Sequence, residues 1–92
     1  FHMGSEKGST LASSICDKMR EASLPGLTRC LPKKSSSEDW TKNAWYTIKG
    51  VKTPIALCCE PLFMDTHRDL LTFEHLKTIG GAIASGIVSW SL

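Results

Sequence analysis

The sequence has no apolar stretch that is long enough to cross a membrane. Its longest uncharged run, residues 78–92, has 15 residues and includes one threonine and three serines, whereas a membrane-spanning helix needs about 20 consecutive, mostly apolar residues. No secretory signal is recognisable at the N-terminus. We therefore expect a soluble protein of intracellular type that has no membrane partner.

The sequence also lacks the short motifs of the common enzyme classes. It contains no phosphate-binding P-loop, no GxGxxG and no GxSxG. A cysteine (Cys30 or Cys58) beside a histidine would supply a nominal nucleophile and base. The candidate histidines are His67 and His75, but no spacing places either of them beside a cysteine. We expect a non-catalytic protein without a cofactor, and a small cysteine or metal-dependent enzyme is the less favoured alternative.

The four cysteines match neither a disulfide framework nor a zinc site. They are Cys16, Cys30, Cys58 and Cys59. No paired C-x-x-C, the arrangement typical of zinc sites, is present. Cysteines without the spacing of a small secreted protein are typical of a reducing compartment. We expect four free thiols, at least three of them buried, and no metal.

The composition is that of one small folded domain. The chain has 92 residues, of which 41% are hydrophobic and 22% charged, and these are ordinary values for a globular protein with one modest core. We expect a single globular interaction domain over residues 9–92. Residues 1–8 would form a flexible leader, whose first five residues resemble a cloning remnant.

The segment from Ser9 to Leu24 has the periodicity of an amphipathic helix. Leu11, Ile15 and Met19 recur at every fourth position, and this spacing places them on one face of a helix. Ser9 or the threonine that follows can cap the N-terminus, and the Pro25–Gly26 pair ends the pattern.

A second helical pattern begins at Thr72, which can cap it, and continues to the end of the chain. Its apolar residues alternate in steps of three and four, so we expect a core helix packed through one stripe. The stripe consists of Phe73, Leu76, Gly80, Ile83, Ile87 and Trp90, and Ile79, Ala84 and Val88 widen it. Gly80, Gly81 and Gly86 each cost about 1 kcal/mol relative to alanine inside a helix. We expect them to let another element approach closely, and a break at Gly80–Gly81 is the alternative.

Two apolar runs in the middle of the chain predict a β-hairpin. Residues Trp45 to Ile48 are rich in aromatic and β-branched side chains, Lys49 to Lys52 form a candidate turn, and Pro54 to Cys58 form the second run. A short helix is expected from Asp65 or Thr66 to Leu71. The predicted fold class is therefore α+β: a small single domain, mostly helical, with one two-stranded β-hairpin.

Basic residues are concentrated in the middle of the sequence. Eight of the eleven basic residues but three of the nine acidic residues lie between Lys18 and Lys52, so this stretch has a net charge of +5 and the remainder −3. Such a stretch favours an acidic or nucleic-acid partner, although a solvated face with scattered lysines fits the same count. The candidate binding residues grouped by charge alone are Lys18, Arg29, Lys33 and Lys34.

About half of the chain resembles the C-terminal domain of rhabdovirus phosphoproteins. The matching positions are the run Lys49-Gly-Val-Lys-Thr-Pro-Ile55, then Asp65, Thr66 and Arg68, and then the stripe of Ile83, Ile87 and Trp90. The stretch from Leu27 to Ala44 departs from the family because it is shorter, and Pro61 stands where the family has an aromatic residue. The basic position similar to that of the family is Arg20.

The resemblance implies a non-catalytic polymerase cofactor in viral RNA replication. Such a domain binds the viral nucleoprotein on its RNA template and, through the full-length protein, tethers the large polymerase subunit. The expected location is the host cytoplasm and the virion, and the domain itself is expected to be a monomer. The alternative is a single-stranded nucleic-acid-binding module, in which Trp45 and Tyr46 stack on bases beside Lys49 and Lys52.

Overall fold

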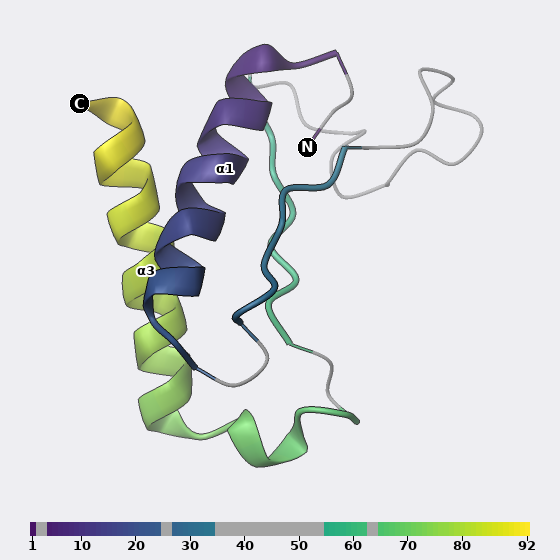
Figure 1. Cartoon of the computed structure of the whole chain (residues 1–92), viewed down its shortest axis with the longest axis vertical. Helices are drawn as coiled ribbons and strands as arrows, with labels where there is room; N and C mark the ends of the chain where they lie inside the picture. Colours follow the sequence, from purple (N-terminus) through teal and green to yellow (C-terminus); the bar gives the residue numbers. More distant parts are fainter. Residues whose placement is uncertain (2–3, 25–26, 35–54, 63–64) are drawn as a thin grey trace.

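The computed structural model describes residues 1, 4–24, 27–34, 55–62 and 65–92. Two α-helices, α1 (Glu6–Glu21) and α3 (Phe73–Ser91), form most of this part, and a 3₁₀ turn, η1 (Arg68–Leu70), precedes α3. The two helices lie side by side, and residues 27–34 and 55–62 run along the other side of α1 (Figure 1). Neither helix in the described part is long and apolar enough to span a bilayer.

The predicted α+β fold with a β-hairpin is wrong. The described part of the chain contains no β-strand, and residues 55–58, which belong to the predicted second strand, have no regular secondary structure. The predicted first strand, Trp45 to Ile48, lies outside the described residues. An apolar run becomes a strand only when a neighbouring backbone completes its hydrogen bonds. Here Leu57 and Leu62 instead pack their side chains against the core formed by the helices.

Helix α1 begins at Glu6 rather than at Ser9, because Ser5 caps it. The Ser5 hydroxyl accepts a hydrogen bond from the Gly8 backbone N–H at 2.9 Å, which satisfies one of the free donors of the first turn. The helix therefore includes residues that the sequence analysis assigned to the leader. Beyond its C-terminus, Ser23 has a left-handed conformation, with φ of 56°, which turns the chain away from the helix axis.

The prediction of a long helix after Thr72 is confirmed. The Thr72 hydroxyl accepts a hydrogen bond from the His75 backbone N–H at 3.3 Å, and the helix continues without a break through Gly80–Gly81. The short helix predicted before it is reduced to the single turn of η1. Asp65 does not cap that turn, since its carboxylate accepts a hydrogen bond from the neighbouring Thr66 N–H at 2.8 Å.

The face of α3 that packs inward matches the predicted stripe only in part, because Ile79 and Ile83 contact the core. Its buried residues are Ile79, Ala82 and Gly86. By contrast, Phe73 is 77% exposed, Leu76 50% and Ile87 45%. Apolar residues surround most of this helix, so periodicity alone did not identify the face that contacts α1. The prediction that the core-facing stripe runs through Phe73, Leu76 and Ile87 is therefore wrong.

Helices α1 and α3 are in close contact at Gly86. A Cβ atom at this position would lie 2.5 Å from the Cα of Ile15, so only glycine allows this contact. Beside it, the Ser14 hydroxyl donates a hydrogen bond to the Gly86 carbonyl at 2.7 Å. The core below this contact is a cluster of Ile15, Met19, Leu27, Ile79 and Ala82. The expected close approach at a glycine is thus confirmed at Gly86, whereas added Cβ atoms at Gly80 and Gly81 would meet nothing within 4 Å.

Candidate functional site

The predicted binding residues on α1 are paired with carboxylates of the same helix. The Lys18 ammonium lies 3.3 Å from the Glu21 carboxylate, and the Arg20 guanidinium pairs with Asp17. Arg20 also donates a hydrogen bond to the carbonyl of Cys30, which joins α1 to the segment that follows it. These two cations are therefore engaged within the domain, and Arg20 helps to position residues 27–34.

The other three predicted residues, Arg29, Lys33 and Lys34, lie exposed on residues 27–34, which we call the basic segment. Within the described part of the chain, their side chains form no ion pair or hydrogen bond. The segment is anchored through its backbone, because the Lys33 carbonyl accepts a hydrogen bond from the N-terminal ammonium of Phe1 at 2.9 Å. It offers three positive charges to a partner, and no carboxylate among the described residues has to be displaced from them.

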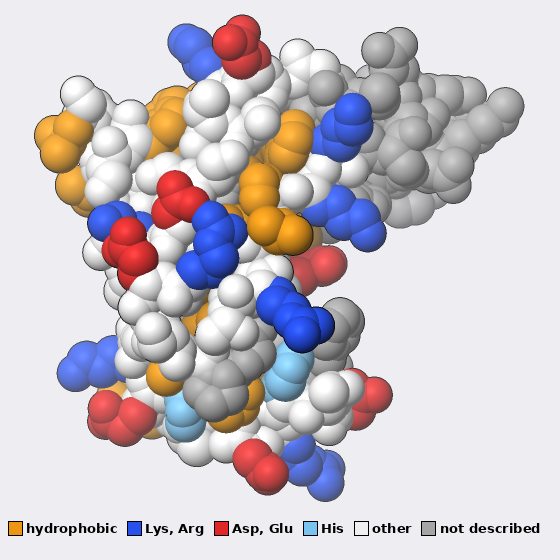
Figure 2. All heavy atoms as spheres, in the orientation of Figure 1, with side chains coloured by type: hydrophobic (Ala, Val, Ile, Leu, Met, Phe, Trp, Pro, Cys, Tyr) orange, Lys and Arg blue, Asp and Glu red, His pale blue; other side chains and the backbone are white. Residues whose placement is uncertain are grey.

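Basic side chains do not form one continuous patch on the face shown in Figure 2. Lysine and arginine side chains are spread over this face, and acidic side chains lie among them. The sequence alone is compatible with either a basic patch or a solvated surface of mixed charge. Among the described residues on this face, the cations therefore lie in local groups with acidic side chains between them.

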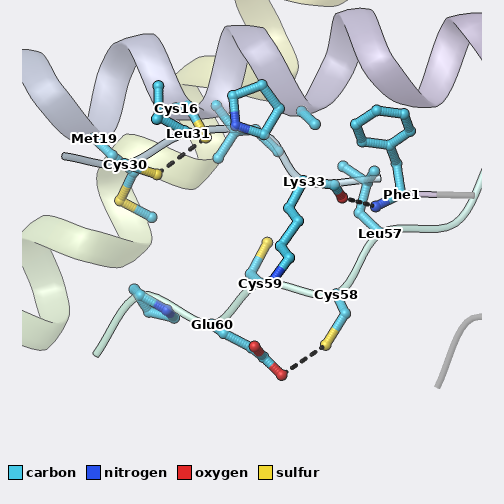
Figure 3. Close-up of a pocket in the computed structure, with 14 residues that line it drawn as sticks. Phe1, Cys16, Met19, Cys30, Leu31, Lys33, Leu57, Cys58, Cys59 and Glu60 are labelled. Atoms are coloured by element: carbon cyan, nitrogen blue, oxygen red, sulfur yellow. Dashed lines mark hydrogen bonds between the residues drawn. The ribbon is translucent and has the colours of Figure 1, made fainter. Parts of the chain in front are cut away.

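All four cysteines line one cavity, which the sequence analysis did not anticipate. The cavity has a volume of about 670 Å³ and lies between α1, the basic segment and residues 55–62 (Figure 3). Cys16 comes from α1, Cys30 from the basic segment, and Cys58 and Cys59 from residues 55–62. Only Cys16 is buried, and Cys59 is exposed, so the expectation of at least three buried thiols is wrong.

Two of these thiols are in direct contact. The Cys30 thiol donates a hydrogen bond to the Cys16 sulfur, and the two Sγ atoms are 3.0 Å apart. Figure 3 shows this pair on the helix side of the cavity, while Cys58 points away from it toward the Glu60 carboxylate, 3.9 Å from its Sγ atom. The cavity thus holds one close thiol pair and two further thiols that are not part of that pair.

The surroundings of the cavity keep two of the thiols protonated. Burial raises the pKa of Cys16 to about 12, and the neighbouring Cys30 adds to this effect. Although Cys59 as a residue is exposed, the atoms around its thiol partly desolvate it and raise its pKa, with further contributions from Cys58 and Cys30. A catalytic cysteine needs a depressed pKa, because the thiolate is the reactive form. Cys16 and Cys59 therefore lack the environment of an enzyme nucleophile.

The structure does not bring a cysteine–histidine pair together among the described residues. Cys30 contacts Cys16, while the ring of His75 lies 2.7 Å from the Thr72 hydroxyl that caps α3. Neither His67 nor His75, the two histidines in the described part of the chain, lines the cavity. Within residues 1, 4–24, 27–34, 55–62 and 65–92, no group of three or more histidine, cysteine or acidic side chains is arranged to hold a metal ion.

Comparisons with protein-family models, curated proteins and solved structures find no match to this chain. The likeness to rhabdovirus phosphoproteins therefore stays a prediction from the sequence. The fold and the cavity define a small helical domain with an exposed basic segment and a thiol-lined hollow.

Proposed function

We propose that this chain is a non-catalytic interaction domain that binds an acidic macromolecular partner through its basic segment. The observation that supports this proposal is the exposure of Arg29, Lys33 and Lys34 on one segment, without a carboxylate partner among the described residues. A cation without an internal partner can form a new ion pair without breaking an existing one. The partner suggested by the sequence resemblance is the viral nucleoprotein on its RNA template.

This kind of surface suits a tether that must be released repeatedly. Charge complementarity at an exposed rim increases the association rate more than the affinity, and it makes binding sensitive to salt. The field of such a surface extends about 8 Å at physiological ionic strength. A cofactor that holds the polymerase large subunit on its template needs contacts of this sort, because the polymerase has to move along that template.

The five predicted residues would differ in their roles in such a contact. Arg29, Lys33 and Lys34 would face the partner. Arg20 would act mainly inside the domain, because it holds the Cys30 carbonyl and so orients the basic segment against α1. Lys18 would contribute least, since its ammonium lies 3.3 Å from the Glu21 carboxylate and an exposed pair of this kind already screens its charge.

The test is a binding measurement with charge-reversed variants of the full chain. The chain is immobilised and exposed to lyssavirus-type and vesiculovirus-type nucleoprotein–RNA rings, and in parallel to naked poly-uridine RNA, at increasing salt. We expect binding to the rings that weakens with salt. The variant with Arg29→Glu, Lys33→Glu and Lys34→Glu should bind at least about tenfold more weakly, since each lost cation also adds an opposing charge.

The chain offers a control with the same change in charge. Lys7, Arg68 and Lys77 are also one arginine and two lysines, and all three are exposed outside the basic segment. Their reversal to glutamate should leave binding to the rings within about threefold of the unaltered chain, because they lie outside the proposed contact. Equal losses in both triple variants would show a response to net charge alone, and no binding to any ring would contradict the proposal.

The naked RNA separates the alternative function from the proposed one. The residues named for base stacking, Trp45 and Tyr46, lie outside the described residues. If the chain binds poly-uridine as tightly as it binds the rings, with a steep salt dependence, a nucleic-acid-binding module replaces the tether. Binding to the rings but not to the naked RNA supports the tether.

A further inference from the structure

The contact between Cys16 and Cys30 has the geometry of a reduced pair that is ready to be oxidised. Their Sγ atoms are 3.0 Å apart, and a disulfide requires about 2.05 Å. The remaining change is about 1 Å, and Cys30 lies on a segment without regular secondary structure. Closing the bond therefore does not require a helix to be broken.

We propose that Cys16 and Cys30 form a thiol–disulfide exchange site, which small-molecule disulfides convert into an intramolecular disulfide. The site goes beyond the proposed binding function, because it concerns a covalent reaction of two thiols and not ion pairs of the exposed cations. The cavity of about 670 Å³ gives a small disulfide access to the pair. The product would join α1 covalently to the basic segment.

The exchange proceeds in two steps through Cys30. Cys30 is partly exposed whereas Cys16 is buried, so the Cys30 thiolate attacks one sulfur of the small disulfide. A bond forms between the two sulfurs, the S–S bond of the reagent breaks, and the released thiolate takes up the proton that Cys30 lost. The Cys16 thiolate then attacks the Cys30 sulfur and displaces the second thiolate, which takes up the Cys16 proton. One reagent disulfide is reduced to two thiols, and two protein thiols are oxidised to one disulfide.

The second step is expected to limit the rate near neutral pH. Burial and the contact with Cys30 hold the pKa of Cys16 at about 12, so the reactive thiolate is rare. The charged or titratable groups that act on this thiol are Cys30, Cys59 and the Arg20 guanidinium. Once Cys30 carries the reagent, burial still raises the pKa of Cys16. Closure should therefore accelerate as the pH rises, while the mixed disulfide on Cys30 accumulates at lower pH.

The two other thiols of the cavity are not expected to join this reaction. Cys58 and Cys59 are neighbours in the sequence, and Cys58 points toward Glu60 rather than toward the pair (Figure 3). Burial and the nearby thiols raise the pKa of Cys59, which lowers its fraction of thiolate. The structure thus predicts one specific pairing out of the possible ones.

Peptide mapping of the full chain tests this pairing. The folded protein is incubated with glutathione disulfide at mildly alkaline pH, the remaining thiols are blocked with iodoacetamide, and the protein is digested with trypsin. Trypsin separates the cysteines, because Cys16 falls in residues 8–18, Cys30 in residues 30–33, and Cys58 with Cys59 in residues 53–68. We expect the first two peptides to be cross-linked, and the third to carry two blocked thiols.

Variants and a denatured sample serve as the controls. Cys30→Ser should abolish the cross-link, Cys16→Ser should leave glutathione on Cys30, and Cys58→Ser should keep the yield within about twofold. In concentrated urea the preference for the Cys16–Cys30 pair should be lost, since it depends on the fold. Circular dichroism verifies that each variant is helical, and the pairing in the unaltered chain decides the result even if a variant misfolds. A dominant Cys58–Cys59 disulfide, a cross-link to residues 53–68, or no disulfide at all in the folded protein would overturn the proposal.

Discussion

A methyl group on Gly86 would lie 2.5 Å from the Cα atom of Ile15, at the point where α3 crosses α1. Ile15 cannot move away from this contact, because its side chain is 6% exposed and belongs to the core. The contact therefore sets the distance between the two helices. Of the three glycines inside α3, Gly86 is therefore the one that this packing requires.

Gly86→Ala should destabilise the domain, since the added methyl group meets backbone atoms that cannot move aside. We expect the free energy of unfolding to fall by about 2 kcal/mol or more, as for other overpacked sites. The matched control is Gly80→Ala, where an added Cβ meets nothing within 4 Å; it should gain up to about 1 kcal/mol from helix propensity. Urea unfolding followed by circular dichroism measures both, and equal effects would contradict the observed packing.

The two apolar faces of α3 should respond differently to truncation. Ile79 is 5% exposed and Phe73 is 77% exposed. Ile79→Ala should lower the free energy of unfolding by about 2–4 kcal/mol, because it leaves a cavity in the core. Phe73→Ala should change it by about 0.5 kcal/mol or less, as is usual for an exposed position. If Phe73→Ala proved the more damaging substitution in chemical denaturation, the predicted stripe would be right after all.

The start of α1 can be tested with two serines in the same helix. Ser5→Ala removes the hydroxyl that accepts the Gly8 N–H at 2.9 Å and should cost about 1 kcal/mol of stability. Ser9→Ala lies inside the helix and should be neutral or slightly stabilising, because alanine has the higher helix propensity. Thermal unfolding of the two variants compares them directly, and a larger loss for Ser9→Ala would place the cap where the sequence analysis put it.

The raised pKa of Cys16 predicts a loss of stability at high pH. The ordinary pKa of a cysteine thiol is 9.0, and burial raises that of Cys16 to about 12. Between these values the unfolded chain has lost the proton while the folded chain retains it, so the folded state binds more protons and its stability falls as the pH rises. The stabilisation that the protonated Cys16 thiol contributes is fully present below pH 9.0 and is lost as the pH rises through 12.

Reduced wild-type protein and Cys16→Ala should therefore diverge in their pH dependence. We expect the free energy of unfolding of the wild type to fall more steeply above pH 9.0, by up to about 1.4 kcal/mol per pH unit relative to the variant. Urea titrations with a phosphine reductant present measure the two slopes, so that disulfide formation does not interfere. Parallel slopes would show that Cys16 titrates as an ordinary exposed thiol.

The positions of the two helices could be predicted because helical signals are local. The spacing of Leu11, Ile15 and Met19 indicated α1, and the Thr72 hydroxyl marked the start of α3. The hairpin could not be predicted reliably, since an apolar run such as Pro54 to Cys58 shows neither whether a pairing strand exists nor where it lies. Hairpin pairing depends on a second segment, whereas a helix completes its hydrogen bonds within itself.

The candidate site was only partly visible in the sequence. Counting charges identified Arg29, Lys33 and Lys34, which the structure leaves exposed. The family resemblance added Arg20, which the structure uses to hold the Cys30 carbonyl. The thiol pair carried no sequence signal, because Cys16 and Cys30 match no known spacing. Only the approach of the basic segment to α1 brings the two sulfurs to 3.0 Å.

The sequence by itself determined the approximate positions of the two α-helices in the described part of the chain, how one of them is capped and where the cations are concentrated. These properties depend on residues within one or two helical turns of each other. Tertiary structure alone decided which face of α3 is buried, which glycine is indispensable and which cysteines meet. Helix α3 is apolar on most sides, so its sequence does not select the buried face. The face is selected by the contact with Ile15 of α1, which fits only against Gly86 because glycine has no side chain.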